Sequence, residues 1–169
     1  MKKKQAGFSL VELMIVVAVI GIMSAFAALA YRSWTDKYNV ERQTKEMYVD
    51  LMKARVNAMS RNRIHFVTFT ATQYTIYEDD NPWPDGNGTL EADGAPPDDR
   101  TVMTKTLSTY AISVTGNATK EFNERGRANV GGSIYTTDRY GSAYDCVVID
   151  DFRINMGKWN TTTTNCDAK

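Results

Sequence analysis

Histidine and cysteine are scarce in this chain, which has one histidine, His65, and two cysteines among its 169 residues. It also lacks a Gly-x-Ser-x-Gly motif and a glycine-rich phosphate-binding loop. A lone histidine in a strand is usually a packed side chain whose hydrogen bonds are satisfied, and two cysteines that pair leave no thiol for catalysis or zinc binding. Because no nucleophile and base stand out, the sequence predicts a protein that is not an enzyme.

Net charge is also absent, because 20 basic residues balance 20 acidic ones. Overall charge therefore indicates no partner. Charge is locally absent as well, since Glu12 is the only charged residue from Phe8 to Tyr31. At about 1.5 Å per helical residue, this stretch is long enough to cross a hydrocarbon core of roughly 30 Å.

Glu12 is out of place in such a stretch. A carboxylate in a membrane-spanning helix costs on the order of a few kcal/mol, somewhat less near the helix end. Opposite charges attract strongly in a low dielectric, whereas either one alone is penalised. We therefore expect Glu12 to pair with a positive group on a neighbouring chain.

Three interpretations of the N-terminus compete. A secretory signal peptide would use the lysines at 2–4 and a cleavage site at 28–30, but the apolar stretch is too long and Glu12 interrupts it. A plain single-pass anchor explains the length and places the C-terminal body outside, but it gives Gly7 and Glu12 no role. In the third interpretation, cleavage between Gly7 and Phe8 leaves the apolar helix on the mature protein.

The third interpretation rests on a resemblance. A short basic leader ends in Gly7, and Phe-Ser-Leu-Val-Glu-Leu-Met-Ile-Val-Val-Ala-Val-Ile-Gly-Ile follows. This resembles the class III leader and N-terminal helix of type IV pilins and type II secretion pseudopilins. The resemblance implies that a prepilin peptidase cuts after Gly7 and methylates the amino group of Phe8, and that Glu12 receives the Phe8 amine of an adjacent subunit during assembly. It does not extend to Leu29, where many members have a proline that would let the helix melt locally.

The apolar pattern continues beyond the membrane-length stretch at helical spacing. One mostly apolar stripe follows steps of four and three, which predicts a face that lies against a sheet. Its members are Val40, Thr44, Met47, Leu51, Ala54 and Ala58. The sequence therefore predicts one helix of roughly 50 residues that ends near Met59 to Asn62.

Beyond this helix, β-branched and aromatic runs predict strands. Residues 64–70 and 73–77 form a predicted hairpin, and further strands are predicted at 101–107, 110–114, 118–122, 132–136, 144–149 and 152–155. The predicted fold class is α+β, a pilin fold in which a long N-terminal helix, transmembrane in its first half, packs on a mainly antiparallel head. The predicted segments are a leader at 1–7, a transmembrane and assembly helix at 8–31, an amphipathic second half at 32–62 and a head at 63–169.

Two short patterns in the head resemble a subgroup of the family. They are Ala54-Arg55 with Ala58 and Arg61, and Phe122-Asn123-Glu124-Arg125-Gly126-Arg127 before Gly131-Gly132-Ser133-Ile134. Both look like the GspH/FimT class of minor pseudopilins and minor pilins.

Cys146 and Cys166 would lie on the outer side of the membrane, where disulfides form and persist. We expect them to pair. Closing a loop of this size removes unfolded-chain entropy worth roughly 3 kcal/mol. Pilins with a C-terminal disulfide-bounded loop, which the chain resembles, point the same way.

Residues 78–100 form an acidic segment with prolines and glycines, which predicts a long exposed loop. Its oxygen ligands are closely spaced, so calcium is a candidate cofactor. The candidate ligands are Asp85, Asn87, Glu91 and Asp93. The glycine is out of register for an EF-hand loop, and a solvated acidic loop without an ion is the commoner case.

Nucleic acid is the alternative partner. A DNA-binding minor pilin would need basic side chains gathered on one surface. The candidates are Arg125, Arg127, Arg139 and Lys158. Acidic residues are interspersed among them, which argues against this alternative.

The sequence thus predicts a structural subunit of a type IV pilus-like or type II secretion pseudopilus filament. The expected partners are the membrane, the prepilin peptidase, other pilin or pseudopilin subunits and the inner-membrane assembly platform. The expected location is the bacterial inner membrane, with one pass and a periplasmic head, and then a periplasmic or extracellular filament.

Overall fold

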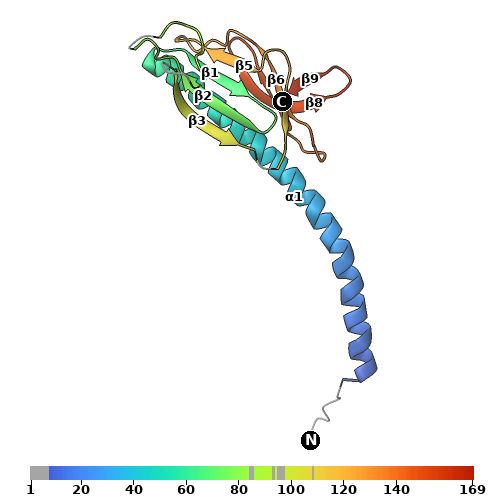
Figure 1. The fold of residues 1–169 in the computed structure, drawn as a ribbon. Helices are drawn as coiled ribbons and strands as arrows, with labels where there is room; N and C mark the ends of the chain where they lie inside the picture. The colour runs from blue at the N-terminus through green and yellow to red at the C-terminus, as the bar shows by residue number, and fades with distance from the viewer. Residues whose placement is uncertain (1–7, 84–85, 93, 95–97, 108) are drawn as a thin grey trace, which may run out of the picture. The chain divides into compact units, whose positions relative to one another are not determined.

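The computed structural model describes residues 8–83, 86–92, 94, 98–107 and 109–169, and of residues 27–30 it describes the backbone alone. A long helix, α1 (Leu10–Arg61), is followed by the strands β1 to β9 (Figure 1). The chain divides into two compact units, Met1–Asp36 and Lys37–Lys169. The second is called the head unit below.

Helix α1 is 52 residues long, which confirms the predicted length. It ends in a defined C-terminal cap. Asn62 adopts a left-handed conformation with φ 53°, and the amide of Arg63 donates to the carbonyl of Ala58 at 3.1 Å. This is the 6→1 bond of a Schellman motif, in which the chain reverses and the last carbonyls are satisfied. The predicted end near Met59 to Asn62 is therefore correct.

Within the head unit, α1 buries the predicted stripe. All six residues of the stripe, from Val40 to Ala58, are at most 1 % exposed. Thr44 is tolerated in this dry face because its hydroxyl donates to the carbonyl of Val40 at 2.9 Å.

The first sheet contains four antiparallel strands in the order β3-β2-β1-β5. Their bounds are β1 (His65–Phe69), β2 (Gln73–Glu78), β3 (Arg100–Thr106) and β5 (Thr119–Phe122). The predicted hairpin is confirmed as β1 and β2, which pair from His65 opposite Glu78 to Phe69 opposite Tyr74.

The second sheet contains five antiparallel strands in the order β4-β6-β7-β8-β9. Their bounds are β4 (Ile112–Val114), β6 (Gly132–Thr136), β7 (Cys146–Ile149), β8 (Ile154–Asn160) and β9 (Asn165–Ala168). The predicted strand at 152–155 is displaced in the structure, because Phe152 lies in the turn before β8. Strand β9 was not predicted.

One hydrophobic cluster joins α1 to both sheets. Leu51 of the helix, Val67 and Ile76 of the first sheet, and Ile134 and Val147 of the second sheet all belong to it. Burial of apolar side chains is the main favourable term in folding. The second half of α1 and the two sheets therefore form a single folding unit.

A disulfide joins Cys146 of β7 to Cys166 of β9, across the intervening strand β8. The predicted pairing is confirmed. Trp159 of β8 lies in the same small cluster and stacks on Tyr135 with ring centroids 3.7 Å apart. The polar segment between Asn160 and Asn165 is thus the turn of a hairpin whose second strand is tied to the sheet.

We predict that replacing both cysteines, Cys146→Ser with Cys166→Ser, lowers the free energy of unfolding by roughly 3 kcal/mol, because the unfolded chain regains the entropy of the opened loop. Denaturant unfolding of the detergent-solubilised protein, followed by tryptophan fluorescence, measures this. Reductant should destabilise the native chain by a similar amount and leave the double variant unchanged. Equal stability of the two proteins under oxidising conditions would contradict the prediction.

Candidate assembly site

The first half of α1 exposes an almost unbroken apolar surface. Between Leu10 and Phe26 its large apolar side chains each expose between 45 % and 74 % of their surface. Its best 18-residue window has a mean hydropathy of 2.7, so its length and composition would allow a membrane crossing. A signal sequence near the N-terminus passes the same test. Length and composition therefore do not separate a membrane-crossing helix from a signal sequence. The charged residue inside the stretch, Glu12, is what distinguishes them.

Glu12 lies in the first turn of α1. The amide of Leu13 donates to the carbonyl of Ser9 at 3.2 Å, which makes Ser9 the residue that caps the helix. Glu12 then occupies the third helical position, and the Ser-x-x-Glu pattern is typical of a capping box. Its carboxylate thus has two possible roles: satisfying a backbone amide of its own chain and presenting a negative charge to another chain. Phe8, 73 % exposed, lies just before the cap.

In the head unit, Phe122 to Ala128 form a tight reversal after β5. Asn123 organises it, since its side-chain oxygen accepts from the amides of Arg125 at 3.1 Å and Arg127 at 2.9 Å. The amide of Gly126 donates to the carbonyl of Asn123 at 2.8 Å, and Phe122 bridges to Ala128. The backbone therefore turns back on itself within a few residues.

Gly126 brings this reversal against α1. It has a left-handed φ of 71°, and a β-carbon there would lie 2.6 Å from Sδ of Met59 and 3.2 Å from Nε of Arg55. The two short patterns that suggested a subgroup from sequence, around Arg55 and around Gly126, are therefore in contact in the fold.

A second close approach involves Gly132, whose φ is 143°. A β-carbon there would lie 2.7 Å from Nζ of Lys120 and 2.6 Å from the carbonyl oxygen of Thr115. Lys120 is completely buried and donates to the carbonyls of Gly131 at 2.9 Å and Thr115 at 3.3 Å. Burial lowers the pKa of Lys120. Gly132 thus makes room for a buried ammonium that ties β5 to the start of β6.

These features match known sequence families. The profile of the prokaryotic N-terminal methylation motif matches residues 2–28, and the profile of the type II transport protein GspH matches residues 43–151. The second match covers more than half of the chain. The chain belongs to the GspH family. The GspH region spans the second half of α1, the first sheet and most of the second sheet.

Similar proteins include fimbrial subunits. A fimbrial protein of Pseudomonas aeruginosa is 38% identical over 88 residues, which cover 51% of this chain and 56% of that protein. A type IV major fimbrial protein FimA of Dichelobacter nodosus is 55% identical over 40 residues, covering 24% of this chain and 25% of that protein. The chain thus spans about half or less of the length of these relatives. No solved structure matches it.

An ion cluster closes the end of this GspH head. Glu78, 1 % exposed, accepts from Arg61 at 2.7 Å, from Arg63 at 2.9 Å and from Arg100. Burial alone would raise the pKa of Glu78, but the hydrogen bonds and charges of the three arginines outweigh it and lower the pKa. The cluster joins the end of α1 to the ends of β2 and β3.

The predicted exposed acidic loop needs correction at both of its ends. Glu78 belongs to β2, and Asp79 and Asp99 are 1 % and 4 % exposed. Asp79 accepts from the amides of Asn87 at 3.1 Å and Gly88 at 2.7 Å. Burial raises the pKa of Asp79 and of Asp99. These carboxylates hold the loop to the head because they satisfy backbone amides, which composition does not show.

The calcium prediction falls only partly on residues that the structure describes. Asp85 and Asp93 lie outside the described residues. Glu91 accepts hydrogen bonds from the side chains of Asn87 at 2.8 Å and Thr89 at 2.6 Å. Over the described part of the chain, no three acidic, histidine or cysteine side chains are arranged to hold a metal ion. Calcium binding stays a prediction.

The four basic residues proposed for DNA fall into two pairs. Arg125 and Arg127 lie in the reversal after β5, where Arg127 approaches Asp151 at 3.5 Å. The positive charges of Arg139 and Lys158 favour a lower pKa for the buried Asp145, but burial has the larger effect and raises the pKa of that carboxylate. Both pairs thus have acidic neighbours, and DNA binding stays a prediction.

His65 is completely buried at the start of β1. Its Nδ1 lies 3.2 Å from the carbonyl oxygen of Arg63, whereas Nε2 is buried with no hydrogen-bond partner in the described structure. Burial lowers the pKa of His65 below its ordinary value of 6.5. The predicted packing in a strand is confirmed, but the prediction that the histidine is satisfied is correct for only one of its two nitrogens.

We predict that Gly126→Ala lowers the free energy of unfolding by roughly 1 to 3 kcal/mol, because alanine is strained at this φ and its β-carbon meets Met59. Denaturant unfolding measures the change. Gly141→Ala is the matched control, since Gly141 has a similar φ of 67° but a β-carbon there would meet no atom within 4 Å. A loss no larger than that of the control would show that the contact with α1 is unimportant.

A second prediction concerns the loss of stability of the protein at acidic pH. The unfolded chain binds the His65 proton more tightly than the folded chain, so stability falls as pH drops below about 6.5. Between pH 7.5 and 5.5 the free energy of unfolding of the native protein should fall by up to about 1.4 kcal/mol more than that of the His65→Gln variant. Asp79, Asp99 and Asp145, whose pKa values are raised, act with the opposite sign but are present in both proteins. Parallel pH profiles of the two proteins would contradict the prediction.

Proposed function

We propose that this chain is a structural subunit of a type IV pilus-like or type II secretion pseudopilus filament. A prepilin peptidase would remove residues 1–7 by cutting after Gly7 and would methylate the new amino group of Phe8. The mature chain would remain in the inner membrane with its head unit in the periplasm until the assembly platform adds it to a filament. Its role is mechanical rather than catalytic.

The observation that carries the proposal is one carboxylate in the first turn of an otherwise apolar and exposed helix. Lipid would satisfy the apolar side chains but would leave Glu12 without a counter-charge. The free amine of Phe8 on a neighbouring subunit supplies that charge in an apolar setting, where an ion pair is favoured over two separate ions. The match of residues 2–28 to the N-terminal methylation motif supports the same assignment.

Small residues in the same segment would allow neighbouring helices to pack closely. Ala18, Gly21 and Ala25 recur at three and four residues and let backbones approach closely. A β-carbon at Gly21 would meet nothing within 4 Å, so the chain itself does not require this glycine. Ser24 donates to the carbonyl of Ile20 at 2.7 Å and presents no unsatisfied hydroxyl to a neighbour.

We predict that Glu12→Gln reduces the amount of this chain in filaments at least tenfold and leaves membrane insertion intact. Glutamine keeps the capping-box acceptor but removes the charge, so it separates the two roles of Glu12. Quantitative mass spectrometry of sheared filaments and of the membrane fraction measures both quantities. The mass of the mature chain reports cleavage after Gly7 and methylation of Phe8 in the same samples.

Glu12→Ala, which removes the charge and the capping-box acceptor, and Glu124→Gln, which changes an exposed head residue, are the controls. Glu12→Ala should behave like Glu12→Gln, and Glu124→Gln should assemble normally. If Glu12→Gln assembles normally while Glu12→Ala does not, Glu12 acts as the capping-box acceptor and not through its charge. If both assemble normally, Glu12 has no part in assembly.

A further inference from the structure

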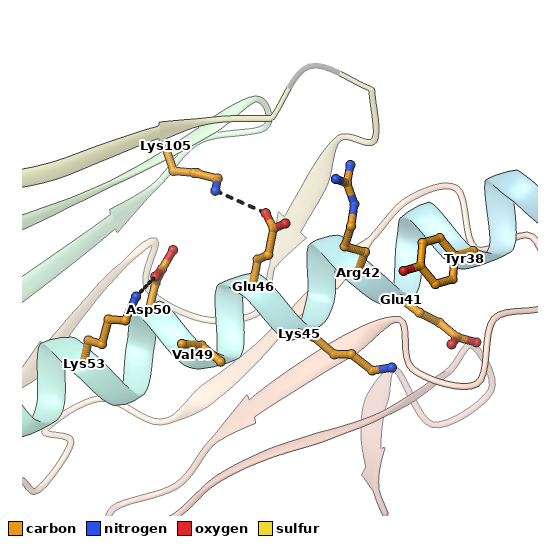
Figure 2. A pocket seen from close by; sticks show the side chains of 9 residues that line it. All are labelled: Tyr38, Glu41, Arg42, Lys45, Glu46, Val49, Asp50, Lys53 and Lys105. Atoms are coloured by element: carbon orange, nitrogen blue, oxygen red, sulfur yellow. Dashed lines mark hydrogen bonds and ion pairs between the residues drawn. The ribbon is translucent and has the colours of Figure 1, made fainter.

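A polar pocket of ≈ 390 Å³ is lined by α1 and by Lys105 of β3. Figure 2 shows Lys105 directed toward Glu46 and Lys53 beside Asp50, and these pairs are 3.1 Å and 3.2 Å apart. The chain itself thus supplies partners to both lysines, and the pocket gives no indication of a ligand. The loop between β2 and β3 contains a more specific feature.

This loop contains the sequence Asn87-Gly88-Thr89. Asn-x-Thr, with x other than proline, is the acceptor pattern for N-linked glycosylation, and in a secreted protein it is expected on a surface loop. All three residues are exposed in the structure. Both the pattern and its position on the surface are therefore those of an acceptor site.

The two side chains that define the pattern lie together. Oδ1 of Asn87 accepts from the amide of Thr89 at 2.8 Å, and the Thr89 hydroxyl lies 2.6 Å from the same oxygen. Nδ2 of Asn87 donates to Oε1 of Glu91 at 2.8 Å. These hydrogen bonds are at the surface, where water or an enzyme can replace them at little cost. Nδ2, the atom that a glycosyl transfer would modify, is therefore within reach of an enzyme.

The backbone of this turn is anchored from the inside. The buried carboxylate of Asp79 accepts from the amides of Asn87 at 3.1 Å and Gly88 at 2.7 Å. Gly86 and Gly88 have left-handed φ values of 77° and 80°, so the chain bends on each side of Asn87. A β-carbon at Gly88 would meet only Cδ1 of Ile64, at 3.9 Å. The turn thus leaves room on its outer side for a bulky group.

Two further Asn-x-Thr patterns begin at Asn117 and Asn160. Thr119 of the first pattern belongs to β5 and pairs with Thr68 of β1. Asn160 is the last residue of β8 and pairs with Asn165 of β9. An enzyme would have to detach either pattern from a sheet. Residues 87–89 lie outside every strand that the structure describes, so this pattern is the most accessible of the three.

We propose that Asn87 is the acceptor of an N-linked glycan, which an oligosaccharyltransferase attaches from a lipid-linked oligosaccharide. This inference rests on the periplasmic location of the head unit in the proposed function. Nδ2 of Asn87 forms a bond to C1 of the first sugar, and the bond from C1 to the diphosphate of the lipid donor breaks. Nδ2 gives up one proton to a base of the enzyme, and the lipid diphosphate leaves.

Peptide mass spectrometry of the full-length chain, taken from membranes of the bacterium that produces it, tests the proposal. We expect the peptide with residues 87–89 to carry a sugar mass in at least half of the molecules. The occupancy of Asn87 should exceed that of Asn117 and Asn160 at least tenfold. Asn87→Gln should remove the sugar mass from the intact protein. A native chain whose Asn87 is unmodified overturns the proposal.

Expression in a second host separates the geometry of the loop from its sequence. The host carries an oligosaccharyltransferase with the acceptor motif Asp/Glu-x-Asn-x-Ser/Thr, which residues 85–89 satisfy, and an acceptor peptide verifies its activity. Thr89→Val should abolish modification of Asn87, whereas Thr89→Ser should retain it. Lys158→Asp completes the same motif at Asn160, where occupancy should stay at least tenfold lower because Asn160 lies in a strand.

Formation of the Cys146–Cys166 disulfide verifies that the head of each variant has folded. In a folded Lys158→Asp protein, equal occupancy of Asn87 and Asn160 would overturn the argument that the exposed loop selects Asn87. An unmodified Asn87 beside a modified acceptor peptide would overturn the acceptor site itself.

The outcomes separate this inference from the proposed function. If the chain enters filaments in a Glu12-dependent way while Asn87 is unmodified, the glycan is wrong and the filament role stands. If Asn87 carries a glycan in a chain that never enters filaments, the acceptor site stands and the filament role fails. If the head does not reach the outer side of the membrane, both proposals fail together.

Discussion

Burial of one face of α1 is the contact on which the head unit depends. The stripe from Val40 to Ala58 meets side chains from both sheets in a single cluster. Neither sheet has another helix within the described residues to cover its apolar side, so loss of this face would expose both. The ion cluster at Glu78 and the contact of Gly126 with Met59 then fix the end of the helix on the strands. These polar and steric contacts add precision to an association that apolar burial drives.

Buried charged side chains in the head hold its loops in place. Glu78 binds three arginines, Asp79 binds two loop amides, and Lys120 binds two carbonyls. A buried charge without partners is strongly destabilising, so each of these groups requires its surroundings to be in place. The arginines that bind Glu78 lie 15 to 22 residues away in the sequence, and the partners of Asp79 and Lys120 lie 5 to 11 residues away. The head therefore gains a unique arrangement of its loops from charges that would be costly in any other fold.

Periodicity and local motifs are sufficient to predict much of this molecule. The buried stripe of α1, the helix end, the hairpin of β1 and β2 and the disulfide agree with the structure, because each depends on near neighbours or on a specific pattern. Strand β9 escapes prediction since its only buried residue is Cys166, and it exists because β8 offers an edge and the disulfide holds it. The burial of Glu78 escapes prediction because its arginines lie 15 to 22 residues away. An aromatic residue at position 152 favours a strand, but the turn before β8 holds Phe152 outside it.

The two halves of α1 meet opposite requirements along one continuous helix. Helical propensity contributes little to the stability of long helices, so each half needs a partner for its apolar side chains. The sheets supply that partner to the second half. The first half has an apolar surface on all sides and must find its partner outside the chain, in lipid or among other helices. Lipid alone would leave the Glu12 carboxylate unpaired, whereas under the proposed function the N-terminus of an adjacent helix would supply both apolar surface and a positive charge. Assembly would therefore complete the burial that folding of the single chain leaves unfinished.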